Sequence, residues 1–356
     1  MSPVTAGLRK VLQKLPKAEL HCHLDGSVRA WTLLELSTAK RIVLPEATPA
    51  TLADWMRVDD ARNLEDYLAR FTVTLDVMQE AASIERIAYE LVVDAAADGV
   101  RYLEARFCPS LNARESLSAE DAVRAALKGL QRGERESGTV ARAIICALRS
   151  IPAPHAQEMA ELAVAFKDRG VVGFDLAGGE AGNSANAHAE AFAFARSHDM
   201  AVTVHAGEGA GPDSIRAAVH GCGANRIGHG TRLYEDSSLL AYVRDRRIPL
   251  EMCLTSNVQT RVSPTFADHP IAQYVAQGIV VTLNTDNRLM SGVSLTDEYV
   301  RAADHLGFDL STLGAIALAS FDAAFIPYAD RLRIRARAAE EIDAVIGEAI
   351  ASGIGT

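Results

Sequence analysis

The feature of this 356-residue sequence that most constrains its fold is a strand-like apolar run that recurs eight times. Several runs are β-rich and lack clean alternation, as at 141–148 and 278–283, which is typical of strands buried on both faces of a parallel sheet. Ala- and Glu-rich stretches with helical spacing separate the runs, for example at 153–169 and 183–197. Eight alternations predict an α/β fold of the (β/α)8 TIM-barrel type. A doubly wound open sheet is the rival fold, but no G-x-G-x-x-G turn follows an early strand. We place the strands within residues 17–26, 100–110, 141–150, 171–180, 200–208, 224–230, 248–257 and 279–287.

The first two runs are unusually far apart. They start about 80 residues from each other, whereas most neighbouring runs start about 25–40 residues apart, as one strand–helix unit requires. The extra length predicts a helical insertion between strands one and two. Within it, Leu64, Tyr67, Leu68 and Phe71 have the i, i+3, i+4, i+7 spacing of an amphipathic helix. This helix either packs on the side of the barrel or forms an apolar lid over the end where barrel active sites lie.

The length and composition fit one barrel domain covering residues 1–356, since no linker, repeat or low-complexity tract interrupts the chain. The net charge of −10 argues against a sequence-independent grip on nucleic acid, although it allows one nucleotide in a pocket. No apolar stretch approaches the roughly 18 residues of a membrane span, and the N-terminus lacks a signal-peptide core. We therefore expect a cytoplasmic protein with no membrane partner, whose oligomeric state stays open. The five scattered cysteines suggest buried, reduced thiols.

Four of the runs end in residues of the kind that bind metals or transfer protons. His21 and His23 share one face of their strand because side chains at i and i+2 point the same way. The carboxyl ends of barrel strands meet at one rim, so such residues should converge there. A single His-x-His is a weak signal, but convergence from four strands is a strong one. The other three endings are His205-Ala-Gly-Glu208, Gly228-His229-Gly230 and Asn284-Thr-Asp286-Asn287.

Five segments resemble the motifs of the adenosine deaminase family, in family order. They read Lys-Ala-Glu-Leu-His-Cys-His-Leu-Asp-Gly at 17–26, Asp-Leu-Ala-Gly at 175–178, His-Ala-Gly-Glu at 205–208, Gly-His-Gly at 228–230 and Asn-Thr-Asp at 284–286. The resemblance spans roughly residues 15–335 and is closest to bacterial adenosine deaminases. It implies an amidohydrolase-type metal barrel and the hydrolytic deamination of a small purine nucleoside. The H-x-E and P-C-x-x-C signature of the other zinc deaminases is missing.

The chemistry of deamination and the resemblance agree on a metal site. Hydroxide must reach purine C6, and a zinc ion held by three imidazoles and one carboxylate can lower the pKa of a water toward neutrality. We predict one Zn²⁺ per site, with His21, His23, His205 and Asp286 as ligands. Cobalt or iron would fit the same ligands. The fourth strand has no lysine that could bridge a second metal ion.

The proton transfers suggest further catalytic residues. Glu208 is placed to protonate purine N1, for which its carboxyl must itself carry a proton, as a dry pocket favours. His229 is the candidate for orienting the attacking water, and the resemblance gives Asp286 the task of steering that water's proton. The other six histidines lie in or near predicted helices and turns, where we expect structural or solvated roles.

Substrate contacts follow from the resemblance alone. It implies that the backbone of Gly178 meets purine N3 and that Asp25 accepts a hydrogen bond from the ribose 5′-hydroxyl, which favours a nucleoside over free adenine. Tyr67, Leu68 and Phe71 fall where the family has its apolar gate.

Two features depart from the animal-type pattern. Asn287 stands where those enzymes have aspartate, and an amide can donate to purine N7 without first being protonated. The connection at 110–120 is short and has no tryptophan, so a more open mouth would admit a 5′ substituent. The leading activity is deamination of adenosine or 2′-deoxyadenosine. The alternatives are a 5′-substituted adenosine such as aminodeoxyfutalosine, free adenine, and a non-catalytic barrel that binds a nucleoside or a metal.

Overall fold

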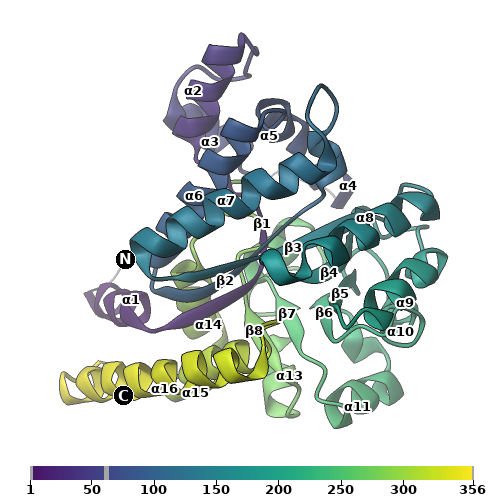
Figure 1. Ribbon diagram of the computed structural model, residues 1–356. Coiled ribbons are helices and arrows are strands. Elements are labelled where there is room, and N and C mark those ends of the chain that lie inside the picture. Colours follow the sequence, from purple (N-terminus) through teal and green to yellow (C-terminus); the bar gives the residue numbers. More distant parts are fainter. Residues whose placement is uncertain (1–2, 60–63, 355–356) are drawn as a thin grey trace.

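Eight parallel strands form one sheet in which each strand pairs with the next along the chain (Figure 1). The computed structural model describes residues 3–59 and 64–354. Its helices surround the strands, so the predicted (β/α)8 barrel is confirmed and each strand falls on its predicted run. The strands are β1 (Lys17–His23), β2 (Val100–Phe107), β3 (Val140–Leu148), β4 (Val171–Ala177), β5 (Ala201–Ala206), β6 (Arg226–His229), β7 (Leu250–Met252) and β8 (Val281–Leu283).

The last strand meets the first through residues just beyond β8. The backbone N–H of Asp286 donates to the carbonyl of His21 (3.0 Å), and the N–H of His23 donates to the carbonyl of Asp286 (2.7 Å). Below them, the Asn284 side-chain oxygen accepts from the N–H groups of Leu20 (2.9 Å) and His21 (3.2 Å). The Asn284–Asp286 motif therefore joins the two ends of the sheet and fixes Asp286 beside β1.

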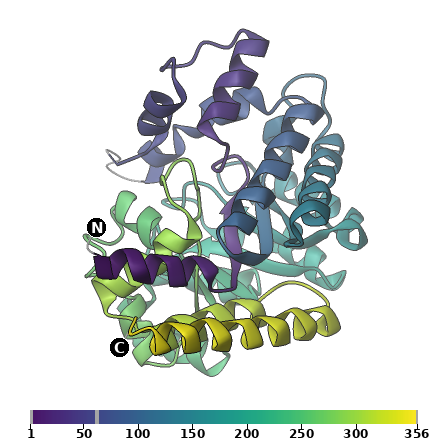
Figure 2. The same cartoon turned by 90° about the vertical axis from the view of Figure 1, so that its left-hand side faces the viewer.

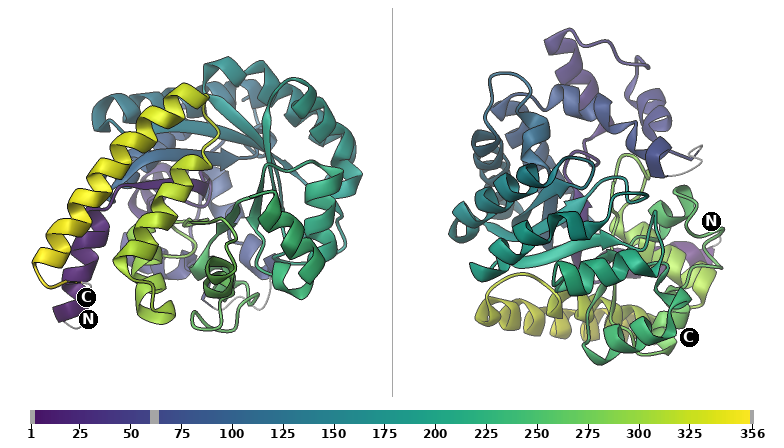
Figure 3. Two further views of the ribbon diagram at one scale, coloured as in Figure 1. Left: turned by 90° about the horizontal axis from the view of Figure 1, so that it is seen from below. Right: turned by 90° about the vertical axis from the view of Figure 1, so that its right-hand side faces the viewer.

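The helices surround the outside of the barrel (Figure 1). Helix α15 packs over β1 and β8, where the sheet meets itself. The first helix, α1, and the last, α16, lie side by side (Figures 2 and 3). Within the described part of the chain, none of the helices has the length and apolar character needed to cross a bilayer. The helices are α1 (Pro3–Lys14), α2 (Ala30–Lys40), α3 (Pro49–Met56), α4 (Leu64–Leu68), α5 (Phe71–Val77), α6 (Ala81–Ala97), α7 (Ala119–Ser137), α8 (Ala153–Ala165), α9 (Ala189–Ser197), α10 (Pro212–Arg216), α11 (Ser237–Asp245), α12 (Leu254–Gln259), α13 (Ile271–Ala276), α14 (Leu295–Leu306), α15 (Leu310–Asp322) and α16 (Tyr328–Ala351).

The insertion between β1 and β2 extends beyond one end of the barrel (Figures 1 and 3). The single amphipathic helix predicted from Leu64 to Phe71 is wrong, because α4 ends at Leu68 and α5 begins at Phe71. The break between α4 and α5 falls at residues 69–70. Arg70 bonds the carbonyl of Trp55 in α3 and stacks on its ring at 4.0 Å. The hydroxyl of Thr72 donates to the Ala69 carbonyl (3.0 Å), so it competes with continuous helix bonding there.

Candidate active site

A cavity of about 250 Å³ opens at the carboxyl ends of the strands, covered by α4 and α5. Ten of the twelve predicted site residues line it, and the two exceptions are His21 and Tyr67. His21 lies fully buried beneath the cavity, with its Nε2 3.3 Å from Asp286 Oδ1. The ten lining residues are His23, Asp25, Leu68, Phe71, Gly178, His205, Glu208, His229, Asp286 and Asn287.

Metal-binding side chains gather at the floor of this cavity. His21, His205, His229 and Asp286 each offer a ligand atom within 4.8 Å of the others. His23 is not part of this tightest group, but its Nε2 lies 3.1 Å from His205 Nε2 and 3.4 Å from Asp286 Oδ1. The site thus holds four imidazoles and one carboxylate, which is one donor more than the four predicted ligands.

The geometry of these donors fits a zinc ion. The buried Nε2 of His21 has no hydrogen-bond partner. Burial lowers the pKa values of His23 and His205, so both rings are neutral near pH 7. Two tetrahedral ligands about 2.0–2.1 Å from zinc are about 3.3–3.4 Å apart, close to the spacing between the Nε2 atoms of His23 and His205. A cation would satisfy all these nitrogen atoms at once.

Two buried carboxylates that we did not predict as functional lie behind the imidazoles. Glu251 Oε2 is 2.9 Å from His21 Nδ1, and Asp175 Oδ2 is 3.1 Å from His205 Nδ1. A carboxylate in this position holds a proton on Nδ1 and leaves the Nε2 lone pair free for a metal ion. This arrangement supports both histidines as ligands.

One arginine joins the two carboxylates. Arg106 is fully buried, with Nη1 3.0 Å from Asp175 and Nη2 2.8 Å from Glu251. Arg226 adds a second contact to Glu251 at 2.6 Å. Although burial opposes ionisation, these arginines hold the pKa of Glu251 well below its usual range. The signal in the sequence was a charge within a strand that is buried on both faces. Such charges lie in β2, β4, β6 and β7, at Arg106, Asp175, Arg226 and Glu251.

Glu208 faces the cavity as a buried acid. Burial, followed by the charges of Asp286 and Glu180, raises the pKa of Glu208 well above its usual range. The Thr260 hydroxyl donates to its Oε1 (3.2 Å), and His229 Nε2 lies 3.4 Å from its Oε2. This shift favours the protonated form of Glu208, whose side chain faces the cavity.

The loop that carries Glu208 is fixed by a second glutamate, which sequence reasoning missed. The buried carboxylate of Glu180 accepts the backbone N–H groups of Gly207 (2.7 Å), Glu208 (2.9 Å) and Gly209 (2.6 Å). Gly207 adopts φ +77°, and a Cβ there would lie 2.6 Å from Ile215. The left-handed conformation of Gly207 lets three successive N–H groups turn toward one carboxylate, so Glu180 holds the path of the loop.

Comparison with known proteins decides the family. The family model described as adenosine deaminase matches residues 16–341. The chain belongs to the adenosine deaminase family. The adenosine deaminase of Mycobacteroides abscessus is 41% identical over 341 residues, which cover 91% of this chain and 94% of that protein. The corresponding protein of Mycobacterium tuberculosis H37Rv is 39% identical over 343 residues, covering 91% and 93%.

Solved structures agree with this assignment. A Burkholderia ambifaria amidohydrolase with bound zinc is 25% identical with a TM-score of 0.88, covering 97% of this chain and 95% of that one. The Arabidopsis thaliana N6-methyl-AMP deaminase is 29% identical with a TM-score of 0.80, covering 93% and 98%. This adenosine deaminase family member is an enzyme of the aminohydrolase type.

Two non-glycine residues at this family site have strained backbones. His229 and Asp286 adopt φ angles of 60° and 61°. A left-handed conformation costs a residue with a side chain about 1–2 kcal/mol and persists only where the surroundings hold it. For Asp286 the backbone bonds to β1 provide that support. Such strain is typical of functional positions and is invisible in the sequence pattern.

All of the residues predicted for substrate contact except Tyr67 line the active-site cavity. Burial raises the pKa of Asp25 to about 7. Gly178 adopts φ +93° on the wall of the cavity. The Asn287 amide packs against Gly26, where an added Cβ would lie only 1.8 Å from Asn287 Oδ1. Tyr67 does not line the cavity. Its buried hydroxyl pairs with Ser291 Oγ (3.0 Å), which ties α4 to the segment after β8.

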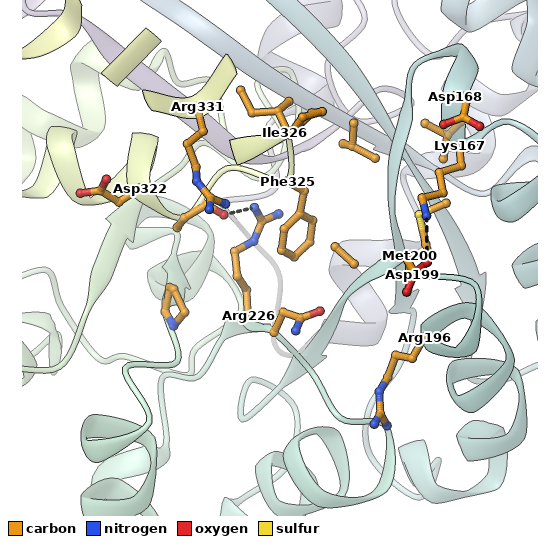
Figure 4. A pocket seen from close by; sticks show the side chains of 17 residues that line it. Lys167, Asp168, Arg196, Asp199, Met200, Arg226, Asp322, Phe325, Ile326 and Arg331 are labelled. Atoms are coloured by element: carbon orange, nitrogen blue, oxygen red, sulfur yellow. Dashed lines mark hydrogen bonds and ion pairs between the residues drawn. The ribbon is translucent and has the colours of Figure 1, made fainter. Parts of the chain in front are cut away.

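A larger cavity of about 770 Å³ opens at the other end of the barrel, next to the first residues of β4, β5 and β6 (Figure 4). None of the twelve predicted residues lines it. Its Arg226 stacks on the Phe325 ring at 3.4 Å and donates to the Ala323 carbonyl (2.8 Å), while Lys167 donates to the His198 carbonyl (2.8 Å). These cationic groups already have partners, so we identify the active site by its converging donors and not by cavity size.

Removal of bound metal should destabilise this adenosine deaminase family member. Metal that binds only the folded state adds about 2.7–4.1 kcal/mol at 100–1,000 times its dissociation constant. We therefore expect dialysis against a chelator to lower the melting temperature by about 5 °C or more, with recovery on addition of Zn²⁺. Calorimetry with elemental analysis measures both. The variant H220Q, at an exposed histidine, should retain its zinc. An identical melting temperature with and without zinc would contradict the site.

Proposed function

We propose that the protein catalyses the hydrolytic deamination of adenosine and 2′-deoxyadenosine to inosine and 2′-deoxyinosine, with release of ammonia. One observation carries the proposal. Glu208, a buried acid whose raised pKa favours its protonated form, and a cluster of imidazoles with Asp286 face the same cavity. An acid beside a set of residues that would hold a metal ion is what the reaction at C6 and N1 of a purine needs.

In this proposal His21, His23, His205 and Asp286 would hold one Zn²⁺ per site. When bound, zinc supplies a nucleophile at neutral pH because it lowers the pKa of a coordinated water. The carboxylates behind His21 and His205 support their part in this set. The bound zinc of the Burkholderia relative supports the choice of metal.

The protein's own groups would move the protons. Glu208 donates its proton to N1 as the C6–O bond forms, and it becomes a carboxylate. Imidazoles, above all that of His21, hold the pKa of Asp286 well below its usual range despite its burial, so this side chain is ionised. As an ionised carboxylate on the floor of the cavity, Asp286 would take up the proton of the attacking water. Passing that proton to the exocyclic amino group allows the C6–N bond to break and ammonia to leave. The C6 hydroxyl then loses its own proton to become the carbonyl, and that proton returns the Glu208 carboxylate to its acid form. His229 lines the same cavity and would orient the attacking water.

The other cavity residues support a nucleoside as the substrate. Asp25 would accept the ribose 5′-hydroxyl, the Gly178 backbone would meet N3, and the Asn287 amide would donate to N7. Leu68 and Phe71 would cover the base. The buried Asp25 carboxyl disfavours a substrate with a 5′-phosphate. The Arabidopsis relative, in contrast, is named for a nucleotide, N6-methyl-AMP.

Initial rates with zinc-loaded protein test the proposal. Adenosine, adenine, AMP and 5′-methylthioadenosine would be compared at equal low concentration, so that the rates rank kcat/KM. Fast turnover of adenosine, with adenine and AMP slower by at least about 10²-fold, is the expected result. A faster rate on the 5′-substituted compound would move the protein to the alternative substrate class. No turnover of any of the four by metal-loaded protein would refute the proposal.

Asn287 gives a prediction about pH. In the variant N287D a carboxyl must be protonated before it can donate to N7, whereas the wild-type amide donates at every pH. Burial and the neighbouring Asp286 charge would raise the pKa of the new carboxyl, and kcat/KM should fall as the pH rises through that value. Rates between about pH 5 and 9 measure this steeper alkaline loss. The exposed variant N186D serves as the control, and superimposable profiles for N287D and wild type would count against the N7 contact.

A further inference from the structure

A chain of buried polar groups leads away from the active site behind His229. Asn257 of α12 lies 3.0 Å from His229 Nδ1 through its side-chain nitrogen, and His269 Nε2 lies 3.1 Å from the Asn257 side-chain oxygen. At the far end, the backbone N–H of Ile271, the first residue of α13, donates to His269 Nδ1 (3.3 Å). All three side chains are at most 2% exposed. We call this chain the His229 relay.

The far end of the relay sets its direction. A backbone N–H can only donate, so His269 Nδ1 must accept from Ile271. Burial lowers the pKa of His269 to about 3, so its ring is neutral and carries its one proton on Nε2. His269 therefore donates to the oxygen of Asn257, and the Thr231 hydroxyl donates to the same oxygen (3.1 Å).

This direction passes through the amide to His229. With the Asn257 oxygen occupied by two donors, its NH₂ group faces His229 Nδ1, which must accept. A ring nitrogen that accepts a hydrogen bond carries no proton, so this ring is also neutral. Its single proton then lies on Nε2, the atom that points into the cavity and lies 3.4 Å from Glu208.

The group behind Nδ1 differs between His229 and the neighbouring histidines, and this difference determines which Nε2 atoms are free to bind a metal. His21 and His205 each have a carboxylate behind Nδ1, which leaves Nε2 with a free lone pair. His229 has a donor behind Nδ1, which leaves Nε2 with a proton. We propose that Asn257 and His269 are positioning residues that hold His229 as the Nε2–H tautomer, so that it donates a hydrogen bond into the cavity and does not act as a metal ligand.

The relay also resolves the surplus of donors at the site. Of the five candidate groups, His229 is the one that cannot lend a lone pair while Asn257 keeps this orientation. Only the use of the donated hydrogen bond, to hold the oxygen that adds to C6, rests on the proposed function. The tautomer itself does not depend on the substrate.

Nitrogen NMR of protein with ¹⁵N-labelled histidine tests the tautomer directly. A bare ring nitrogen resonates far downfield of a protonated one, and the H229Q variant identifies the His229 signals by their loss. We expect a bare Nδ1 and a protonated Nε2 in the wild type. The opposite tautomer would overturn the inference, whether or not the protein deaminates adenosine.

An isosteric variant tests the role of the relay. In N257D at about pH 8, the new carboxylate still accepts from His269 and Thr231 but can only accept from His229, so the proton of His229 should move to Nδ1. We expect kcat for adenosine to fall at least about 10²-fold together with this change, as happens when a catalytic imidazole has the wrong tautomer. T231V is the matched control, since it removes one bond to the Asn257 oxygen but leaves the bond from His269. In T231V the tautomer of His229 should be unchanged, and kcat should stay within about threefold of wild type. A tautomer change in N257D without loss of kcat would overturn the positioning role. If N257D does not fold, the wild-type and T231V spectra still decide the tautomer.

Discussion

Replacement of Glu208 by glutamine should lower kcat for adenosine by about 10²–10⁴-fold while KM stays within a few-fold of wild type. The amide keeps the size of the side chain and can still donate a hydrogen bond to N1, so the substrate should still bind. It cannot transfer a proton, and without that transfer C6 is a poor electrophile. The effect therefore belongs to the transition state rather than to the ground state.

Steady-state kinetics and metal analysis separate this result from simple damage. E208Q should contain as much zinc as wild type, since Glu208 is not among the proposed ligands, and its melting temperature should not fall, because the substitution removes a buried ionisable group. E190Q, at an exposed glutamate on α9, is the control and should retain full activity. A kcat within threefold of wild type in E208Q would exclude Glu208 as the acid.

Much of the barrel and the rim of the site could be predicted because both leave marks in the sequence. Strands buried on both faces read as apolar runs, and polar residues at their carboxyl ends converge in any barrel. His21, His205 and Asp286 were found in this way. The insertion was harder to predict, since its break at residues 69–70 depends on Arg70 reaching Trp55, a contact between separate helices.

The residues behind the ligands were missed for a different reason. Arg106, Asp175 and Glu251 lie within strands. In the sequence, a single charge within a strand does not show which residues it will contact. Their meaning appears only when β2, β4 and β7 are brought together around one guanidinium. The tautomer of His229 likewise depends on a backbone N–H in α13, which no spacing rule connects to β6.

Replacement of Arg106 by methionine should destabilise the fold by about 3–5 kcal/mol and weaken zinc binding by about 10–100-fold. The substitution leaves Asp175 and Glu251 buried without their shared partner. Removing one member of a buried ionic network costs far more than the network contributes, because the remaining charges stay desolvated. Urea unfolding measures the first effect, and competition with a chromophoric chelator measures the second. R114M, at an arginine on the surface, should change neither.

Two further variants separate charge from geometry at this position. R106K keeps the charge, but a single ammonium cannot match the planar fork that contacts two carboxylates, so most of the loss should persist. The triple variant R106M/D175N/E251Q removes the stranded charges and should recover stability, since a neutral network carries no buried net charge. It should not recover zinc affinity, because an amide behind Nδ1 raises the basicity of the imidazole less than a carboxylate does. Recovery of both properties would mean that zinc binding needs only a neutral network at this position. Recovery of stability alone would mean that the carboxylates held by Arg106 prepare His21 and His205 for the metal.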